Sequence, residues 1–101
     1  MSSETGSRQG IQVISRAVKI LRSLEGKSDG LSLSAIANIV DLPRSTVQRI
    51  VSALASERFL ISATQSSRVR LGPGLVSLGS AAKADIDRVL LPHMKNLSLE
   101  I

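Results

Sequence analysis

The sequence has no cysteine, tryptophan or tyrosine, and it contains one phenylalanine and one histidine. Without cysteine there is no disulfide framework, thiolate metal site or cysteine nucleophile, and the chain is compatible with a cytoplasm. Phe59 is expected in the core, which leaves no aromatic platform for stacking single-stranded nucleic acid. The sequence has a single histidine and no glycine-rich phosphate loop, so it offers few of the groups that catalytic sites use. We therefore expect no enzyme, no cofactor and no metal site.

Long apolar runs are also missing. No stretch approaches the roughly 18 apolar residues of a membrane span, and the N-terminus lacks the apolar segment of a signal peptide. The 101 residues include 13 Lys and Arg against 8 Asp and Glu, a formal net charge of +5. A small basic domain favours a polyanionic partner. These features predict a soluble intracellular protein, with no membrane partner.

The segment 33–54, LSAIANIVDLPRSTVQRIVSAL, holds two short amphipathic patterns on either side of a break. Pro43 cannot lie inside a helix and restricts the residue before it, so the chain must turn there. Two helices joined by so short a turn cross each other as a helix-turn-helix. Asp41 occupies the turn position that favours a left-handed residue, which Asp tolerates better than most. The apolar positions at helical spacing are Leu33, Ile36, Ala37 and Val40, then Val47, Ile50, Val51 and Leu54.

The second of these helices has a polar face without a carboxylate until Glu57. Arg pairs bidentately with guanine and Gln with adenine in a major groove, so this face is typical of a recognition helix. A polar arc on an arbitrary surface helix is more often only solvated, and the conjunction with the turn and a wing favours DNA binding. The residues predicted to contact DNA are Arg44, Ser45, Thr46, Gln48 and Arg49, with Ser34 on a phosphate.

A hairpin is predicted after this helix. An extended run at 58–62, a polar turn at 64–67 and a returning strand at 68–71 together form a wing. Alternation places Val69 and Leu71 on one side of the returning strand and Arg68 and Arg70 on the other. The two arginines are suited to phosphate neutralisation or minor-groove entry. The alternative is an edge strand protected by charge.

The flanking segments complete the predicted organisation. Residues 1–10 are polar and lack periodicity, which indicates a disordered arm; residues 11–79 form the winged helix-turn-helix; residues 80–101 form a linker helix. The helix expected over Ile11 to Leu24 has a wide apolar arc. Either that helix is simply well buried, or Ile14 and Val18 at one edge of the arc meet a second subunit. The fold class is mainly α: a three-helix core, a two-stranded β-hairpin wing and the linker.

Three segments carry a family resemblance: SRAVKILRSLEG; LSLSAIANIVDLPRSTVQRIVSALASERFL; and VRLGPGLVSLGSAA with the later LLPHMKNL. Over residues 11–100 the chain resembles the N-terminal DNA-binding domain of the IclR family of bacterial transcription regulators. Three positions depart from the family pattern. Arg58 and Asp41 stand where the family usually has glycine, and Val69 stands where the wing usually has an aromatic residue.

The resemblance implies a cytoplasmic bacterial regulator that binds an inverted repeat of double-stranded operator DNA as a homodimer or dimer of dimers, with repression favoured over activation. It implies a C-terminal domain, absent here, that binds a small organic effector. It matches the five residues named above to the recognition helix and both arginines to the wing. The segments that match the family's dimerising ones contain Ile14, Val18, Leu21, Ile86, Val89 and Leu90. A rival hypothesis is a winged-helix module for protein interaction or dimerisation without direct DNA contact.

Overall fold

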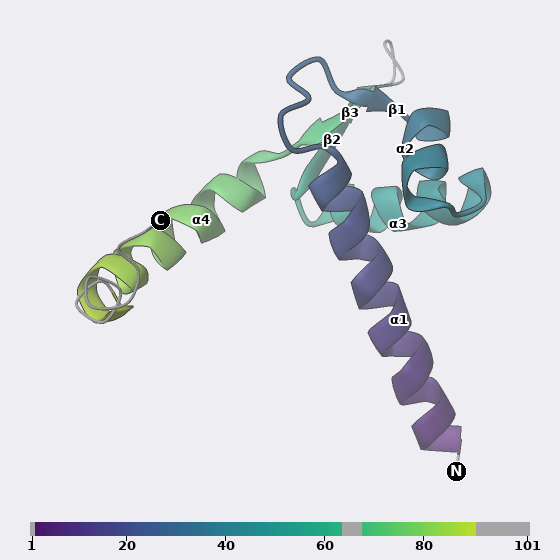
Figure 1. The fold of residues 1–101 in the computed structure, drawn as a ribbon, viewed down its shortest axis with the longest axis horizontal. Coiled ribbons are helices and arrows are strands. Elements are labelled where there is room, and N and C mark those ends of the chain that lie inside the picture. Colours follow the sequence, from purple (N-terminus) through teal and green to yellow (C-terminus); the bar gives the residue numbers. More distant parts are fainter. Residues whose placement is uncertain (1, 64–67, 91–101) are drawn as a thin grey trace.

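The computed structural model describes residues 2–63 and 68–90 (Figure 1). The chain is mainly helical with a small antiparallel sheet, which confirms the predicted fold class of a winged helix-turn-helix followed by a helix. The helices and strands are, in order, α1 (Ser2–Ser23), β1 (Leu31–Ser32), α2 (Leu33–Val40), α3 (Arg44–Ser56), β2 (Leu60–Ala63), β3 (Arg68–Leu71), α4 (Pro73–Asp85) and a π-helical segment, Ile86–Leu90.

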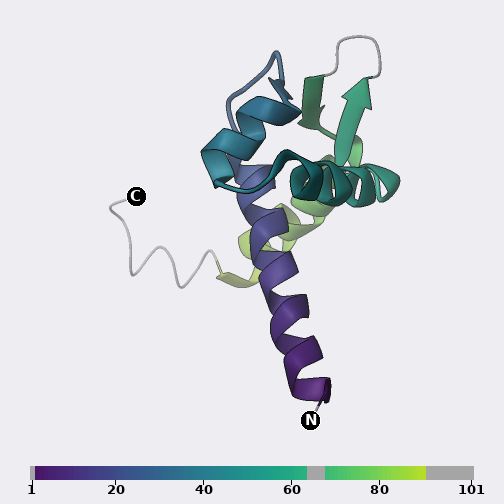
Figure 2. The same cartoon turned by 90° about the vertical axis from the view of Figure 1, so that its right-hand side faces the viewer.

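The first helix is longer than predicted. α1 begins at Ser2, whereas the composition of residues 1–10 predicts a disordered arm and a helix that starts at Ile11. Once a helix has formed, each further residue adds a backbone hydrogen bond without a new nucleation cost, which favours this extension. The N-terminal half of α1 extends away from the rest of the domain (Figure 2). The C-terminal half packs against the core through Ile20, Leu21 and Leu24.

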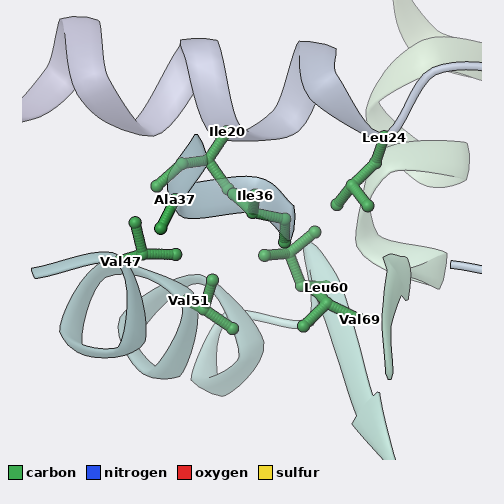
Figure 3. Close-up of a cluster of buried hydrophobic side chains, with 8 residues drawn as sticks. All are labelled: Ile20, Leu24, Ile36, Ala37, Val47, Val51, Leu60 and Val69. Atoms are coloured by element: carbon green, nitrogen blue, oxygen red, sulfur yellow. The ribbon is translucent and has the colours of Figure 1, made fainter. Parts of the chain in front are cut away.

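One hydrophobic core joins the three helices to the sheet (Figure 3). The side chains of Ile20, Ile36, Val47 and Val69 are completely buried, and they come from α1, α2, α3 and β3 in turn. The apolar positions predicted for α2 and α3 all face this core, either buried or packed against it. The helical periodicity therefore assigned the correct face to both helices. The buried residues are Ile20, Leu24, Ile36, Ala37, Val47, Val51, Leu60 and Val69.

The ends of α2 follow the sequence closely. Ser32 caps the N-terminus, because its Oγ accepts a hydrogen bond from the Ala35 amide at 3.1 Å. Asp41 has φ 57° and ψ 52°, the left-handed conformation expected for the turn, and its amide donates to the Ala37 carbonyl. Pro43 then takes an extended conformation immediately before α3. A local sequence signal thus sets the angle between α2 and α3.

The wing belongs to a three-stranded sheet rather than a two-stranded one. The strand order is β1-β3-β2, and both pairings are antiparallel, with Leu31 opposite Val69 and Leu60 opposite Leu71. Gly30 precedes β1 at φ +80°, and a Cβ there would lie 2.7 Å from the Val69 carbonyl oxygen. Only glycine allows this approach of the two strands. The predicted hairpin turn, residues 64–67, lies outside the described residues.

The last helix begins at Pro73, seven residues before the predicted linker boundary at residue 80. Proline is favoured in a first helical turn, and Gly72 before it has an extended conformation. Phe59, predicted as core, is only half-buried, because it lies at this junction beside Gly74. α4 then runs away from the domain (Figure 1), and Val76 and Leu78 on it are exposed. Among the described helices, none combines the length and apolarity that would let it cross a membrane.

Candidate nucleic-acid interface

The outer face of α3 has the chemistry predicted for base recognition. Val47 and Val51 anchor the inner side of the helix in the core. Ser45, Gln48 and Arg49 are exposed on the opposite side. The first turn of α3 contains no acidic residue. A polyanion can therefore approach this face without repulsion from a carboxylate on the helix.

The N-terminus of α3 adds positive potential to the same region. Pro43 supplies no side-chain cap, and the first intrahelical bond runs from the Val47 amide to the Pro43 carbonyl. The amides ahead of Val47 have no partner within the helix, and the helix dipole places partial positive charge there. Arg44 is exposed in this turn, whereas Thr46 is half-buried and faces α1. This end of the helix suits an anionic group.

An open groove of about 660 Å³ separates α1 from α3, and Thr46 and Arg49 line its α3 side. Arg16 of α1 lines this groove and also a smaller depression beside Asp41 and Leu42. No pattern in the sequence singles out Arg16. A helical wheel of α1 shows which residues are polar, but it cannot show which of them face a neighbouring helix. Arg16 thus adds a guanidinium group beside α3 and the turn.

The wing arginines bond to the chain before β1. Arg68 is exposed, and its Nη1 donates to the Gly30 carbonyl at 3.0 Å. Arg70 is half-buried, and its Nε donates to the Ser28 carbonyl at 3.3 Å. Val69 faces the core as the alternation predicts, but Leu71 at the end of the strand is 40% exposed. Both arginines lie on the wing, and each contacts the backbone of the same loop.

The residues predicted to form a dimer lie on two separate helices. Ile14 on α1 is 65% exposed and Val18 is 41% exposed, whereas Leu21 is partly buried against the core. Ile86 and Val89 are exposed in the π-helical segment, and the side chain of Leu90 lies outside the described ones. α1 and α4 leave the domain in different directions (Figure 1). One chain therefore does not bring the two sets together.

Ser34 is exposed in the first turn of α2, where the sequence places a phosphate contact. Across residues 2–63 and 68–90, no three His, Cys, Asp or Glu side chains are grouped so that they could hold a metal ion. What the described residues gather around α3 is guanidinium, amide and hydroxyl groups. These groups bind phosphates and base edges.

A helix-turn-helix followed by a hairpin wing, with a basic helix face free of carboxylates, defines a winged helix-turn-helix of the DNA-binding class. Residues 13–61 match the family described as the IclR helix-turn-helix domain. The chain belongs to the IclR family, whose members found here are transcriptional regulators and not enzymes.

Individual relatives agree with this assignment. The HTH-type transcriptional regulator TtgV of Pseudomonas putida is 47% identical over 97 residues, which are 95% of this chain and 37% of TtgV. The HTH-type transcriptional repressor AllR of Salmonella paratyphi A is 32% identical over 95% of this chain and 36% of its own length. The crystal structure of an IclR transcriptional regulator from Alicyclobacillus acidocaldarius has a TM-score of 0.67 and 30% identity, covering 70% of this chain and 29% of that one. The chain thus spans between 29% and 37% of the length of these three proteins.

Proposed function

We propose that this chain binds double-stranded operator DNA with a preference for an inverted repeat, and that α3 enters the major groove. The observation that carries the proposal is the exposed outer face of α3, where Ser45, Gln48 and Arg49 lie opposite the buried valines. Membership of a family of helix-turn-helix regulators supports the same function. In the proposed complex, Arg49 pairs with a guanine and Gln48 with an adenine.

Phosphate contacts would orient the domain without reading sequence. We assign them to Ser34 at the start of α2, Thr46 in the first turn of α3 and Arg68 on the wing, with Arg44 shared between bases and backbone. Arg16 extends this set, because it lies between the turn and α3. Arg70 was also predicted to contact DNA, but it is half-buried and bonded to Ser28, and this geometry favours another role.

The proposed DNA-binding species is a homodimer, or a dimer of dimers in the full-length protein. Ile11, Ile14, Val18 and Leu21 recur on α1 at alternating spacings of three and four residues, as in a coiled-coil seam. The first three members of this stripe are exposed, whereas Leu21 at its end packs against the core. Ile86, Val89 and Leu90 would extend the contact after α4. Two-fold symmetry of the protein then requires two-fold symmetry of the site.

The rest of the regulator is also a proposal. The relatives are nearly three times as long as the matched region, which agrees with a further domain after the linker. We propose that this domain binds a small organic effector, and that residues 80–101 connect it to the winged helix-turn-helix at 11–79, with α4 as the start of the connection. A relative named as a transcriptional repressor favours repression, and operator binding places the protein in the bacterial cytoplasm.

Fluorescence anisotropy of the chain against a selected pool of duplex DNA, followed by a salt titration on the best binder, tests the function. We expect a steep salt dependence together with a preference for one inverted repeat. The rival function, protein interaction without DNA contact, is favoured by the exposed apolar side chains of Val13 and Ile14 along the groove. Absence of binding, or binding that ignores both sequence and salt, would support the rival.

A further inference from the structure

The sheet connects the wing to the loop that precedes the helix-turn-helix. Residues 28 and 30 of this loop each present a backbone carbonyl to a guanidinium group of β3, at 3.3 Å for Arg70 and 3.0 Å for Arg68. The donors and acceptors are 42 and 38 residues apart in the chain. The same loop is also paired to β3 through β1. Two side-chain bonds and a strand pairing thus fix the position of the loop.

Gly30 makes this arrangement possible. A Cβ at residue 30 would clash with the Val69 carbonyl and would also lie 2.9 Å from Arg70 Cγ. The aliphatic part of the Arg70 side chain therefore occupies the space that a side chain at residue 30 would need. The residue is buried. Arg70 therefore lies between the sheet and the loop, and its side chain bridges them rather than extending only into solvent.

The two wing arginines differ in exposure. Arg68, the first residue of β3, is exposed, whereas Arg70 lies two residues further along the strand and is half-buried. The donor of Arg70 is Nε, the nitrogen nearest the stem, so the bond orients the whole guanidinium plane towards the loop. Arg68 is bonded to the same loop through a terminal nitrogen, Nη1, and the residue is exposed, so Arg68 is the more accessible of the two arginines to a phosphate.

We propose that Arg70 is a positioning residue of the DNA-binding surface: it holds the wing to the loop 28–30 and does not itself neutralise a phosphate. The loop leads directly to Ser32, the N-cap of α2, and to Ser34. Fixing the Ser28 carbonyl therefore fixes the wing relative to the start of the helix-turn-helix. This proposal rests on the proposed function, because the wing's orientation affects binding only if the wing meets DNA.

The first test uses the free chain and needs no DNA. Amide hydrogen exchange is compared among the wild type, Arg70→Met, which keeps a long stem without a donor, and Arg22→Met, which removes an exposed charge from the last turn of α1. We expect the amides of Gly30 and Val69 to exchange about tenfold faster in Arg70→Met and at the wild-type rate in Arg22→Met. Equal rates in all three proteins would overturn the proposal.

If Arg70→Met does not fold, a measurement on the wild type still tests the proposal. The Nε–H of Arg70 should exchange more slowly than the Nε–H of Arg22, because the former is bonded to the Ser28 carbonyl and Arg22 is an exposed residue of α1. It should remain slow after the best-binding DNA is added. Rapid exchange at Arg70 in the free chain, or a loss of protection on DNA binding, would contradict a permanent bond to the loop.

The second test separates positioning from phosphate contact. In Arg70→Met we expect the affinity for DNA to fall while the slope of log affinity against log salt stays at the value of Arg22→Met. Loss of a phosphate contact would instead lower that slope by about one, and this result would overturn the proposal. If the wild type itself does not bind DNA, the proposed function fails, but the exchange experiments still report whether Arg70 holds the loop.

Discussion

The carbonyl oxygen of Arg58 accepts a hydrogen bond from the amide of Gly74 at 2.7 Å, which joins the end of α3 to the start of α4. Arg58 makes this contact from a left-handed conformation, φ 67°. The left-handed backbone of Arg58 therefore lies in direct contact with Gly74, where a Cβ would be only 2.7 Å from the Arg58 carbonyl oxygen. Both residues lie in segments that resemble the IclR family, and Arg58 stands where that family usually has glycine.

Arg58→Gly should stabilise the domain. A left-handed residue with a side chain costs about 1–2 kcal/mol, and the extra freedom of glycine in the unfolded chain offsets about 0.5–1 kcal/mol of that gain. We expect the free energy of unfolding to rise by about 0.5 kcal/mol. Urea denaturation measures this change. A clear decrease would mean that the Arg58 side chain makes contacts that outweigh the backbone strain.

Gly74→Ala should destabilise the domain by about 1–3 kcal/mol, the usual range for overpacking. A Cβ at residue 74 would lie 2.7 Å from the Arg58 carbonyl oxygen and 2.9 Å from Phe59 Cδ1, and a backbone atom cannot move away easily. Gly79→Ala on the same helix is the matched control, since nothing lies within 4 Å of its Cβ position. The control should gain about 0.5–1 kcal/mol from helix propensity. Similar unfolding energies for the two variants would refute the close approach.

Arg49→Ala tests base reading by α3. We expect a loss of about 1–3 kcal/mol in binding free energy on the preferred DNA site, with relaxed selectivity at one base position. The reason is that a bidentate arginine contact distinguishes guanine from the other bases. Anisotropy titrations against a set of single-base variants of the site measure both effects. An equal loss on every sequence would reassign Arg49 to the phosphate backbone.

The sequence predicted the parts of this fold that depend on nearby residues. The faces of α2 and α3, the Ser32 cap and the left-handed turn at Asp41 follow from residues a few positions apart, because helical periodicity and capping are local. The same local periodicity placed Ser45, Gln48 and Arg49 on the exposed side of α3, and their contact with DNA stays a prediction. The start of α1 was placed too late, since composition alone does not show how far a nucleated helix extends.

Tertiary partners were beyond local reasoning. The sequence allows a short strand residue at Leu31, but β1 has only two residues and its partner strand lies almost forty residues later, so no pattern within β1 indicates which strand it pairs with. The bonds of Arg68 and Arg70 to the loop were missed because alternation gives the side of a strand and not the group that covers it. Arg16 was missed because its place beside α3 depends on how two helices pack. Each of these omissions concerns residues that are far apart in the sequence and meet only in the folded chain.

Arg68→Ala should weaken binding to all DNA sequences alike and lower the salt slope by about one. The expectation follows from the exposed position of Arg68 at the start of β3, where a guanidinium group can meet a phosphate without reading bases. Salt titrations on the preferred site and on an unrelated duplex measure the slope. An unchanged slope would show that the wing makes no phosphate contact through this residue.

Two serines at the start of α2 offer a final comparison. Ser32→Ala removes the cap whose Oγ accepts the Ala35 amide, and it should cost about 1 kcal/mol of folding stability. Ser34 is exposed in the first turn of α2, where we propose a phosphate contact. Ser34→Ala should therefore leave the free energy of unfolding within about 0.5 kcal/mol of the wild type and weaken DNA binding. Urea denaturation and anisotropy on the same two proteins separate the effects. If Ser34→Ala left binding unchanged on every duplex, the N-terminus of α2 would have to be removed from the proposed interface.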